Sequence, residues 1–271
     1  MQIRFGYSLS YDFEQPTPMI VTLNVHYSRA SDLVGPDTMI TSPSTSYDSY
    51  RDGFGNWCNR VVAPAGRFQI RADSVVNGSG MADEVATQAR QHPVEELPQE
   101  TLIYLLPSRY CENDKLSDTA WRLFGNTPEG WERVQAISHW VHDHISFGYQ
   151  WARPTKTAAE ALEEGRGVCR DYAHLGIALC RAMNIPARYC TGYLGDIGVA
   201  PSADPMDFSG WFEVFLSGSW LTVDPRNLVP RVGRILIARG RDAADVAITT
   251  TFGPNVLRDF QVWADEIPAA P

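Results

Sequence analysis

Apolar and polar residues alternate with a period of two along the first part of the chain. Residues 3–11 alternate in this way, prolines then interrupt the pattern, and an apolar run resumes at residues 19–27. Further short runs follow at residues 59–63 and 66–70, separated by glycine, asparagine and proline. A period of two is typical of strands, and these small and turn-forming residues connect them. The pattern therefore predicts an antiparallel β-sandwich over residues 1–95.

The hydrophobic pattern changes to a helical period in the next part of the chain. Residues 91–98 contain two prolines and no regular period, which indicates a linker. We expect one helix that ends near Phe124, a second over residues 131–144 with an apolar stripe, and a third that opens at Thr157. A second domain of mixed helices and strands is therefore expected over residues 96–271.

A cysteine stands at the start of a strongly apolar helical run. Cys169 follows a glycine-flanked turn, and the helical run after it ends near Met183. A helix N-terminus carries roughly half a positive elementary charge and unpaired N–H groups, which favour a thiolate. The position therefore predicts a nucleophilic Cys169, and a small buried core residue is the competing interpretation. Three runs beyond this helix predict strands of a central antiparallel sheet: residues 188–194, 210–216 and 220–224.

Composition and charge exclude some classes of protein. The chain has 271 residues, 44% of them hydrophobic, and a net charge of −9. Such a charge argues against a nucleic-acid partner, because phosphate recognition depends on clustered Lys and Arg. The basic stretch at residues 226–241 is interpreted as a strand and turn, solvated and paired with nearby acids. The sequence leaves the oligomeric state open, a homo-oligomer included.

The cysteines and the N-terminal residues bear on the cellular compartment. The chain has no membrane-spanning apolar run, and its first residues lack the basic-then-apolar pattern of a signal peptide. Five cysteines are an odd and sparse set for a disulfide framework, which argues for reduced thiols. We therefore expect a cytoplasmic protein without a membrane partner.

Three motifs in the second domain carry a family resemblance. They read GVCRDYAH at residues 167–174, DFSGWFE at 207–213 and WLTVDP at 220–225. Together they resemble the motifs of bacterial transglutaminase-like proteins, which belong to the papain-like cysteine superfamily. In that family they supply a cysteine nucleophile, a histidine base and an orienting acid. The resemblance extends over nearly the whole chain and implies an α+β fold, with a β-sandwich followed by a helix that carries the cysteine and packs on an antiparallel sheet.

The resemblance implies acyl transfer from a peptide or protein amide through a thioester on Cys169, without a cofactor. Water as the acceptor gives hydrolysis, and an amine gives transamidation. Asp224 occupies the position of the acid, whereas Ser209 occupies that of the histidine. A serine hydroxyl does not titrate near neutral pH and cannot replace an imidazole base. Without an imidazole beside it, Asp224 is expected to face Ser209 or Arg226.

Four residues close to these motifs are expected to contact a substrate: Arg170, Tyr193, Trp211 and Glu213. The aromatic side chains would line an apolar groove beside the cysteine, although such strand residues are often core. Glu213 follows Trp211 by two residues and shares its sheet face, so it would add a carboxylate. Arg170 would help to lower the pKa of the thiol.

The six histidines do not supply an obvious replacement for the base. His174 lies about 140° round the helix from Cys169, so we interpret it as a buried residue bonded to a neighbouring element. His139 and His142 have the spacing of a metal-binding pair, but a solvated helix face is the preferred interpretation. Two hypotheses remain. One is a cysteine-dependent amide hydrolase or acyl transferase with an atypical or absent base, and the other is a catalytically inactive module of the same fold that binds a peptide or a partner protein.

Overall fold

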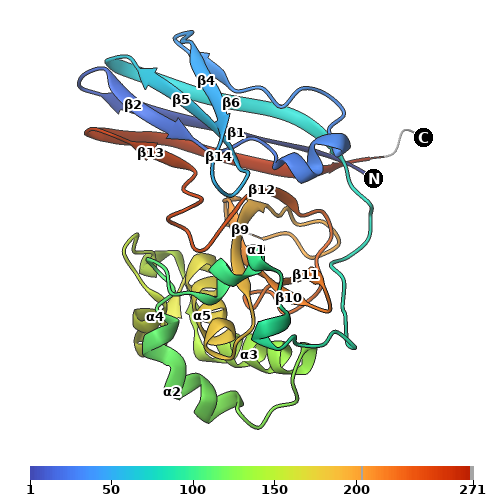
Figure 1. Cartoon of the computed structure of the whole chain (residues 1–271). Helices are drawn as coiled ribbons and strands as arrows, with labels where there is room; N and C mark the ends of the chain where they lie inside the picture. The colour runs from blue at the N-terminus through green and yellow to red at the C-terminus, as the bar shows by residue number, and fades with distance from the viewer. Residues whose placement is uncertain (203, 269–271) are drawn as a thin grey trace.

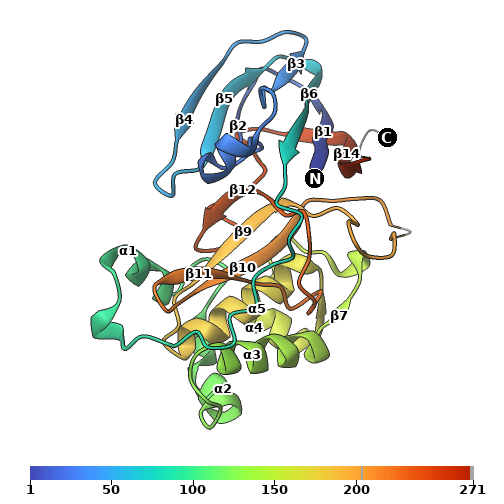
Figure 2. The same ribbon diagram turned by 90° about the vertical axis from the view of Figure 1, so that its right-hand side faces the viewer.

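The computed structural model describes residues 1–202 and 204–268. A two-sheet β-sandwich lies at one end of the molecule, a third sheet lies beneath it, and a layer of helices covers the far side of that sheet (Figures 1 and 2). Within the described residues, no helix combines the length and apolar character that a membrane span requires.

Both sheets of the sandwich are antiparallel. One has the order β14-β1-β6-β3, formed by Asn255–Ile267, Gln2–Phe13, Gly66–Asn77 and Ile40–Ser42. The other has the order β13-β2-β5-β4, formed by Thr249–Thr251, Thr17–Val21, Trp57–Ala63 and Tyr47–Arg51. Along β1, Ile3 and Phe5 are each 1% exposed while Arg4 between them is exposed. The alternation in the sequence therefore places one face of β1 in the core.

The end of the chain returns to the sandwich. Strand β14 pairs with β1 along its whole length, and β13 pairs with β2. These last strands, which the sequence places in the second domain over residues 96–271, therefore pair with strands of the sandwich. Figure 1 shows β14, in red, beside the blue β1. The strand expected at residues 19–27 is also shorter than predicted, because β2 ends at Val21 and the 3₁₀ helix η1 occupies Tyr27–Asp32.

The central sheet has the order β11-β10-β9-β12, and all its pairs are antiparallel. Its strands are β9 (Ala187–Tyr193), β10 (Ser209–Leu216), β11 (Ser219–Val223) and β12 (Ile235–Gly240). Backbone and side-chain hydrogen bonds join its β12 edge to the sandwich. The His26 N–H donates to the Leu236 carbonyl, and the Asn56 side chain donates to the Arg239 carbonyl at 2.7 Å.

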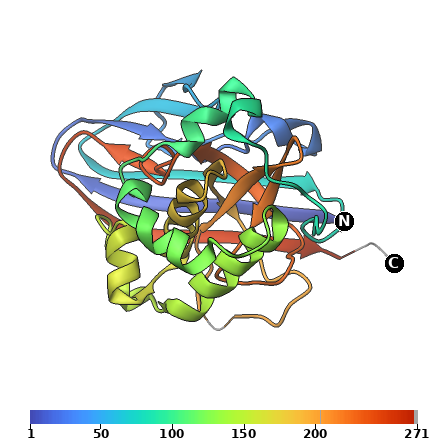
Figure 3. The same ribbon diagram turned by 60° about the horizontal axis from the view of Figure 1, so that its bottom comes forward.

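Four helices form the last layer, seen from their own side in Figure 3: α2 (Asn113–Phe124), α3 (Trp131–His144), α4 (Ala158–Glu164) and α5 (Cys169–Ala182). The short helix α1 (Gln99–Leu102) lies apart from them, as Figure 2 shows. Three short 3₁₀ turns and a two-stranded parallel pair connect them: η2 (Val94–Glu96), η3 (Ile103–Leu105), η4 (Tyr149–Trp151), β7 (Ser146–Phe147) and β8 (Arg166–Gly167).

Helix α5 is the centre of the helical layer. It packs on α2, α3 and α4 and on strands β9 and β10, and its residues from Asp171 to Ala182 are all buried. Gly176 lets it approach the sheet, because a methyl group there would lie 2.6 Å from the Phe212 ring of β10. The predicted helix over residues 131–144 is confirmed, as is the Thr157 start of α4, whereas α2 begins earlier than the sequence indicated.

Candidate active site

Cys169 is the first residue of α5, and its side chain is half-buried. The turn before it is fixed by Asp171, whose carboxylate accepts a hydrogen bond from the Val168 N–H at 2.9 Å. Gly167 makes this cap possible, because a methyl group there would lie 2.5 Å from the Asp171 carboxylate. The local sequence thus places the thiol at a helix N-terminus whose first N–H groups have no intrahelical acceptor.

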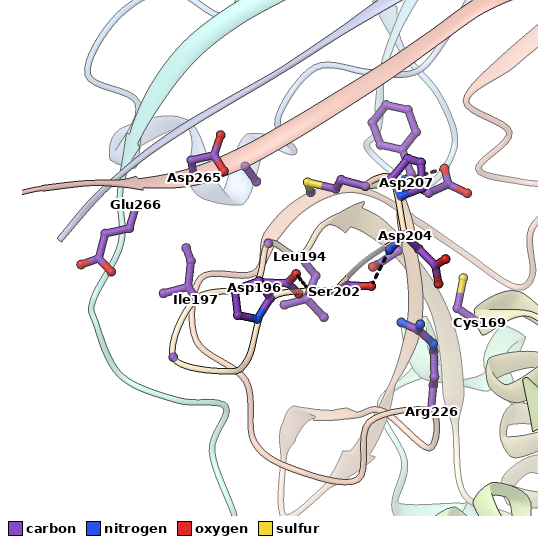
Figure 4. Close-up of a pocket in the computed structure, with 18 of the residues that line it drawn as sticks. Cys169, Leu194, Asp196, Ile197, Ser202, Asp204, Asp207, Arg226, Asp265 and Glu266 are labelled. Carbon is purple, nitrogen blue, oxygen red and sulfur yellow. Dashed lines mark hydrogen bonds between the residues drawn. The ribbon is translucent and has the colours of Figure 1, made fainter.

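Two cavities meet at this thiol, and Figure 4 shows the first of them. The first has a volume of about 400 Å³, and the second about 450 Å³. Cys169, Asp207 and Phe208 line both cavities. Tyr149, Ser209 and Arg226 also line the first, and Tyr110, Arg170 and Tyr189 also line the second.

The surroundings of the sulfur favour the neutral thiol. Burial raises the pKa of Cys169 above its ordinary value, and the negative charge of Asp207 adds to this rise. The Gly210 N–H, which donates a hydrogen bond toward the sulfur, and the Arg226 guanidinium lower the pKa and offset part of the rise. The direction is opposite to the one that the helix position predicts.

Arg170 lines the second cavity, but its guanidinium is engaged away from the sulfur. It donates to the Arg153 carbonyl and lies 5.7 Å from the centre of the Tyr110 ring. Its contribution to the pKa of Cys169 is therefore not among the main causes.

Ser209 lines a cavity with Cys169, whereas Asp224 is held by hydrogen bonds to other residues. Ser209 opens β10 and lines the first cavity with Cys169. Asp224 instead accepts hydrogen bonds from Arg234 at 2.7 Å and from the Asn227 side chain at 2.8 Å. The expectation that Asp224 faces Ser209 or Arg226 is wrong, because Arg234 and Asn227 hold its carboxylate.

The remaining three expected substrate contacts line neither cavity. Trp211 is 2% exposed and packs with Cys190 and Leu236, while Glu213 forms ion pairs with Arg188 at 2.6 Å and Arg239 at 3.4 Å. Both lie on the face of β10 opposite to Phe212, which faces α5.

Tyr193 is fully buried, with its ring 5.2 Å from that of Phe5 in the sandwich. Tyr193 thus contacts the sandwich, whereas Trp211 and Glu213 contact side chains of the neighbouring strands β9 and β12. These three residues therefore do not form the expected groove.

None of the six histidines lines either cavity. His174 is fully buried and accepts a hydrogen bond from the Ala243 N–H at 3.1 Å, which confirms its interpretation as a residue bonded to a neighbouring element. His142 donates from Nδ1 to the Pro225 carbonyl at 2.8 Å. Across the residues that the structure describes, no group of three or more His, Cys, Asp or Glu side chains is arranged for a metal ion.

Other residues around the site show what the sequence identified and what it missed. Cys180 and Cys190 are buried core residues, as predicted. Tyr149 and Arg226 were not identified as cavity residues, and Arg226 lies over the Phe147 ring at 4.0 Å. Asp207 was missed too, although it stands two residues before Ser209 in the same motif.

The five arginines of residues 226–241 include Arg231 and Arg234, which are buried rather than solvated, and which pair with acids as expected.

Comparisons with known proteins agree with the fold. A family model described as the transglutaminase-like superfamily matches residues 118–225. A solved structure of a candidate cysteine protease from Cytophaga hutchinsonii has a TM-score of 0.87 and 30% identity, and the alignment covers all of this chain and 93% of that one. An uncharacterized protein of Mycobacterium leprae is 28% identical over 218 residues, 76% of each chain. An uncharacterized protein of Mycobacterium tuberculosis is 38% identical over 124 residues, 40% of this chain and 38% of that one.

The chain belongs to the transglutaminase-like superfamily. The predicted α+β fold, in which the cysteine helix packs on an antiparallel sheet, is confirmed.

Proposed function

We propose that the protein is a cysteine-dependent amide hydrolase or acyl transferase that forms a thioester on Cys169. The observation that carries this proposal is the position of the thiol, at a helix N-terminus and at the junction of two cavities. Each cavity has a volume typical of ligand sites. One can take the acyl side of a peptide amide and the other its amine side.

The chemistry follows from the acyl group that the sulfur would accept. The Cys169 sulfur attacks the amide carbon, a C–S bond forms, and the C–N bond breaks as the amine leaves with a proton. The unpaired N–H groups at the start of α5 can donate to the oxyanion of the tetrahedral intermediate. Water or a second amine then attacks the thioester and releases the thiol.

The substrate class is a peptide or protein amide, as the resemblance to transglutaminases implies. All five cysteines are free, which supports a reducing compartment, and a cytoplasmic location is part of this proposal.

A second candidate function is peptide binding without catalysis. Two observations favour it: Ser209 stands where the family has its base, and burial raises the pKa of the Cys169 thiol. Such a protein would use the two cavities as a peptide groove. Binding would then not depend on the sulfur.

Intact-protein mass spectrometry separates the two functions. The full chain is mixed with a library of short peptide amides and quenched with acid, and a covalent acyl adduct on Cys169 is expected. Cys169→Ala should form no adduct, and Cys58→Ala, which removes a buried thiol of the sandwich, should form as much as the unchanged protein. Peptide binding by the unchanged protein and by Cys169→Ala, with no adduct in either, would establish the binding module instead.

A further inference from the structure

Asp207 is the titratable side chain that lines both cavities together with Cys169. It lies in the segment before β10 and lines the first and second cavities together with the thiol. Figure 4 shows its carboxylate and the Cys169 sulfur on the same side of the first cavity. Its side chain is accessible from solvent, so a reacting amide has access to it and to the sulfur at once.

The Asp207 carboxylate is not committed to a structural ion pair. Among the described residues, no Lys or Arg side chain forms a salt bridge with it, and its hydrogen bond is to its neighbour, the Phe208 N–H, at 2.6 Å. The other acids of the motifs differ. Asp224 pairs with Arg234 at 2.7 Å, and Glu213 with Arg188 at 2.6 Å. Asp207 therefore has an oxygen available for a proton.

Both positive and negative groups surround Cys169 and Asp207. The pKa of the Tyr149 hydroxyl in η4 depends on the charges of Asp207, Arg226, Cys169 and Asp204. The charge of Asp224 also raises the pKa of the Cys169 thiol. Partial enclosure by the protein raises the pKa of Asp207, which brings this carboxyl nearer to the working range of a general base. The positive charge of Arg226 favours the ionised sulfur.

We infer that Asp207 accepts the proton of the Cys169 thiol and later donates it to the leaving amine. This inference rests on the proposed function and assigns the role that the missing histidine would have. As the C–S bond forms, the S–H proton moves to the Asp207 carboxylate. As the C–N bond breaks, that proton moves to the departing nitrogen. In hydrolysis, Asp207 then takes a proton from the attacking water, the C–S bond breaks, and the proton returns to the sulfur.

The inference has a signature that needs no substrate. Two protonation states of the pair carry the same net charge: Asp207 ionised with a neutral thiol, and Asp207 protonated with a thiolate. The ratio of their populations is therefore independent of pH between the two apparent pKa values, as in other coupled titrations. Alkylation of Cys169 should fall with decreasing pH and then reach a low plateau, instead of falling about tenfold per pH unit throughout.

The experiment measures the rate of Cys169 alkylation by iodoacetamide from pH 5 to pH 10 in the full chain, with site assignment by mass spectrometry. Asp207→Asn should abolish the plateau and shift the upper midpoint to lower pH, because a negative neighbour has been removed. Asp204→Asn removes a charge from the same cavity and should keep the plateau. Asp207→Glu should restore it in part, which shows that a loss in Asp207→Asn is not a folding defect.

Two results would overturn the inference: an unchanged protein without a plateau, or a plateau that Asp207→Asn and Asp204→Asn reduce equally. A peptide that acylates Cys169 adds a second readout, in which Asp207→Asn should slow acylation by roughly 10²–10⁴-fold, the usual contribution of a general base. If no peptide acylates the protein, the proposed function fails, while the alkylation profile still decides whether Cys169 and Asp207 exchange a proton.

Discussion

Ser209 and Cys169 line the same cavity of about 400 Å³, which leaves space for a larger side chain at position 209. We predict that Ser209→His increases the rate of Cys169 alkylation at pH 7 about tenfold, because an imidazole cation beside the sulfur stabilises the thiolate. The gain should stay below that of a complete triad, since Arg234 and Asn227 hold Asp224 away from the new ring.

The rate of alkylation by iodoacetamide at pH 7, quenched at successive times, measures this effect. Ser209→Ala is the matched control, and we expect it to react like the unchanged protein. Equal rates in Ser209→His and Ser209→Ala would show that position 209 does not reach the sulfur.

His26 makes the stability of the protein depend on pH. It is 1% exposed, and burial, together with the charges of Arg239, Arg188 and Arg51, lowers its pKa to about 3. The unfolded chain binds a proton at this site below about pH 6.5, whereas the folded protein does not, so stability falls as the pH falls from 6.5 toward 3. Between pH 7 and pH 5 this site should cost about 2 kcal/mol of unfolding free energy.

Urea unfolding at the two pH values measures that loss. His26→Asn keeps an acceptor for the Ser28 N–H at the start of η1 but cannot titrate, so its loss should be smaller by about 2 kcal/mol. His174, whose pKa burial also lowers, contributes a loss of the same sign in both proteins. Identical losses in the two proteins would mean that His26 is protonated in the folded state.

At the residue scale, the sequence predicted features that neighbouring residues form and missed contacts between residues that lie apart in the chain. Cys169 was identified because its glycines, its helix and its motif are neighbours in the chain. The partner of Asp224 was not, because Arg234 approaches from ten residues further on and is itself held by Asp83 at 2.7 Å. Trp211 and Glu213 were assigned to the wrong face, since alternation shows which residues share a face but not which face meets α5.

Two side chains stabilise the start of helix α4. The Thr157 hydroxyl accepts a hydrogen bond from the Glu160 N–H, and the Glu160 carboxylate accepts one from the Thr157 N–H at 2.9 Å. We predict that Thr157→Ala lowers the free energy of unfolding by about 1 kcal/mol, the usual value of such a cap. Urea denaturation measures it, and Thr155→Ala, in the exposed turn before the helix, should change stability by less than about 0.5 kcal/mol.

A Thr157→Ala protein as stable as the unchanged one would mean that α4 is held by its packing on α5 alone.

The distinction between local signals and tertiary packing also explains which elements the sequence predicted. Helix α3 and the start of α4 have strong local signals, a 3.6-residue period and a cap. Strand β14 has many polar and exposed residues, and only its pairing with β1, more than 240 positions away, makes it a strand.

At the scale of the whole molecule, β14 links the sandwich to the candidate active site. Its residues Ala264, Asp265 and Glu266 line the first cavity, opposite the segment that follows β9 (Figure 4). Gly195 in that segment touches β14 so closely that a methyl group there would lie 1.9 Å from the Ala264 carbonyl oxygen. One wall of the cavity therefore belongs to the sandwich, and the two parts of the chain form the site together.

This contact gives the last prediction. Gly195→Ala should push the segment after β9 away from β14 and lower the free energy of unfolding by about 1–3 kcal/mol, as overpacking does elsewhere. Urea denaturation of the full chain measures the change. Gly53→Ala, which meets no atom within 4 Å, is the control and should stay within about 0.5 kcal/mol of the unchanged protein. If Gly195→Ala were as stable as Gly53→Ala, the sandwich would not brace the cavity wall, and the first cavity would depend on the central sheet alone.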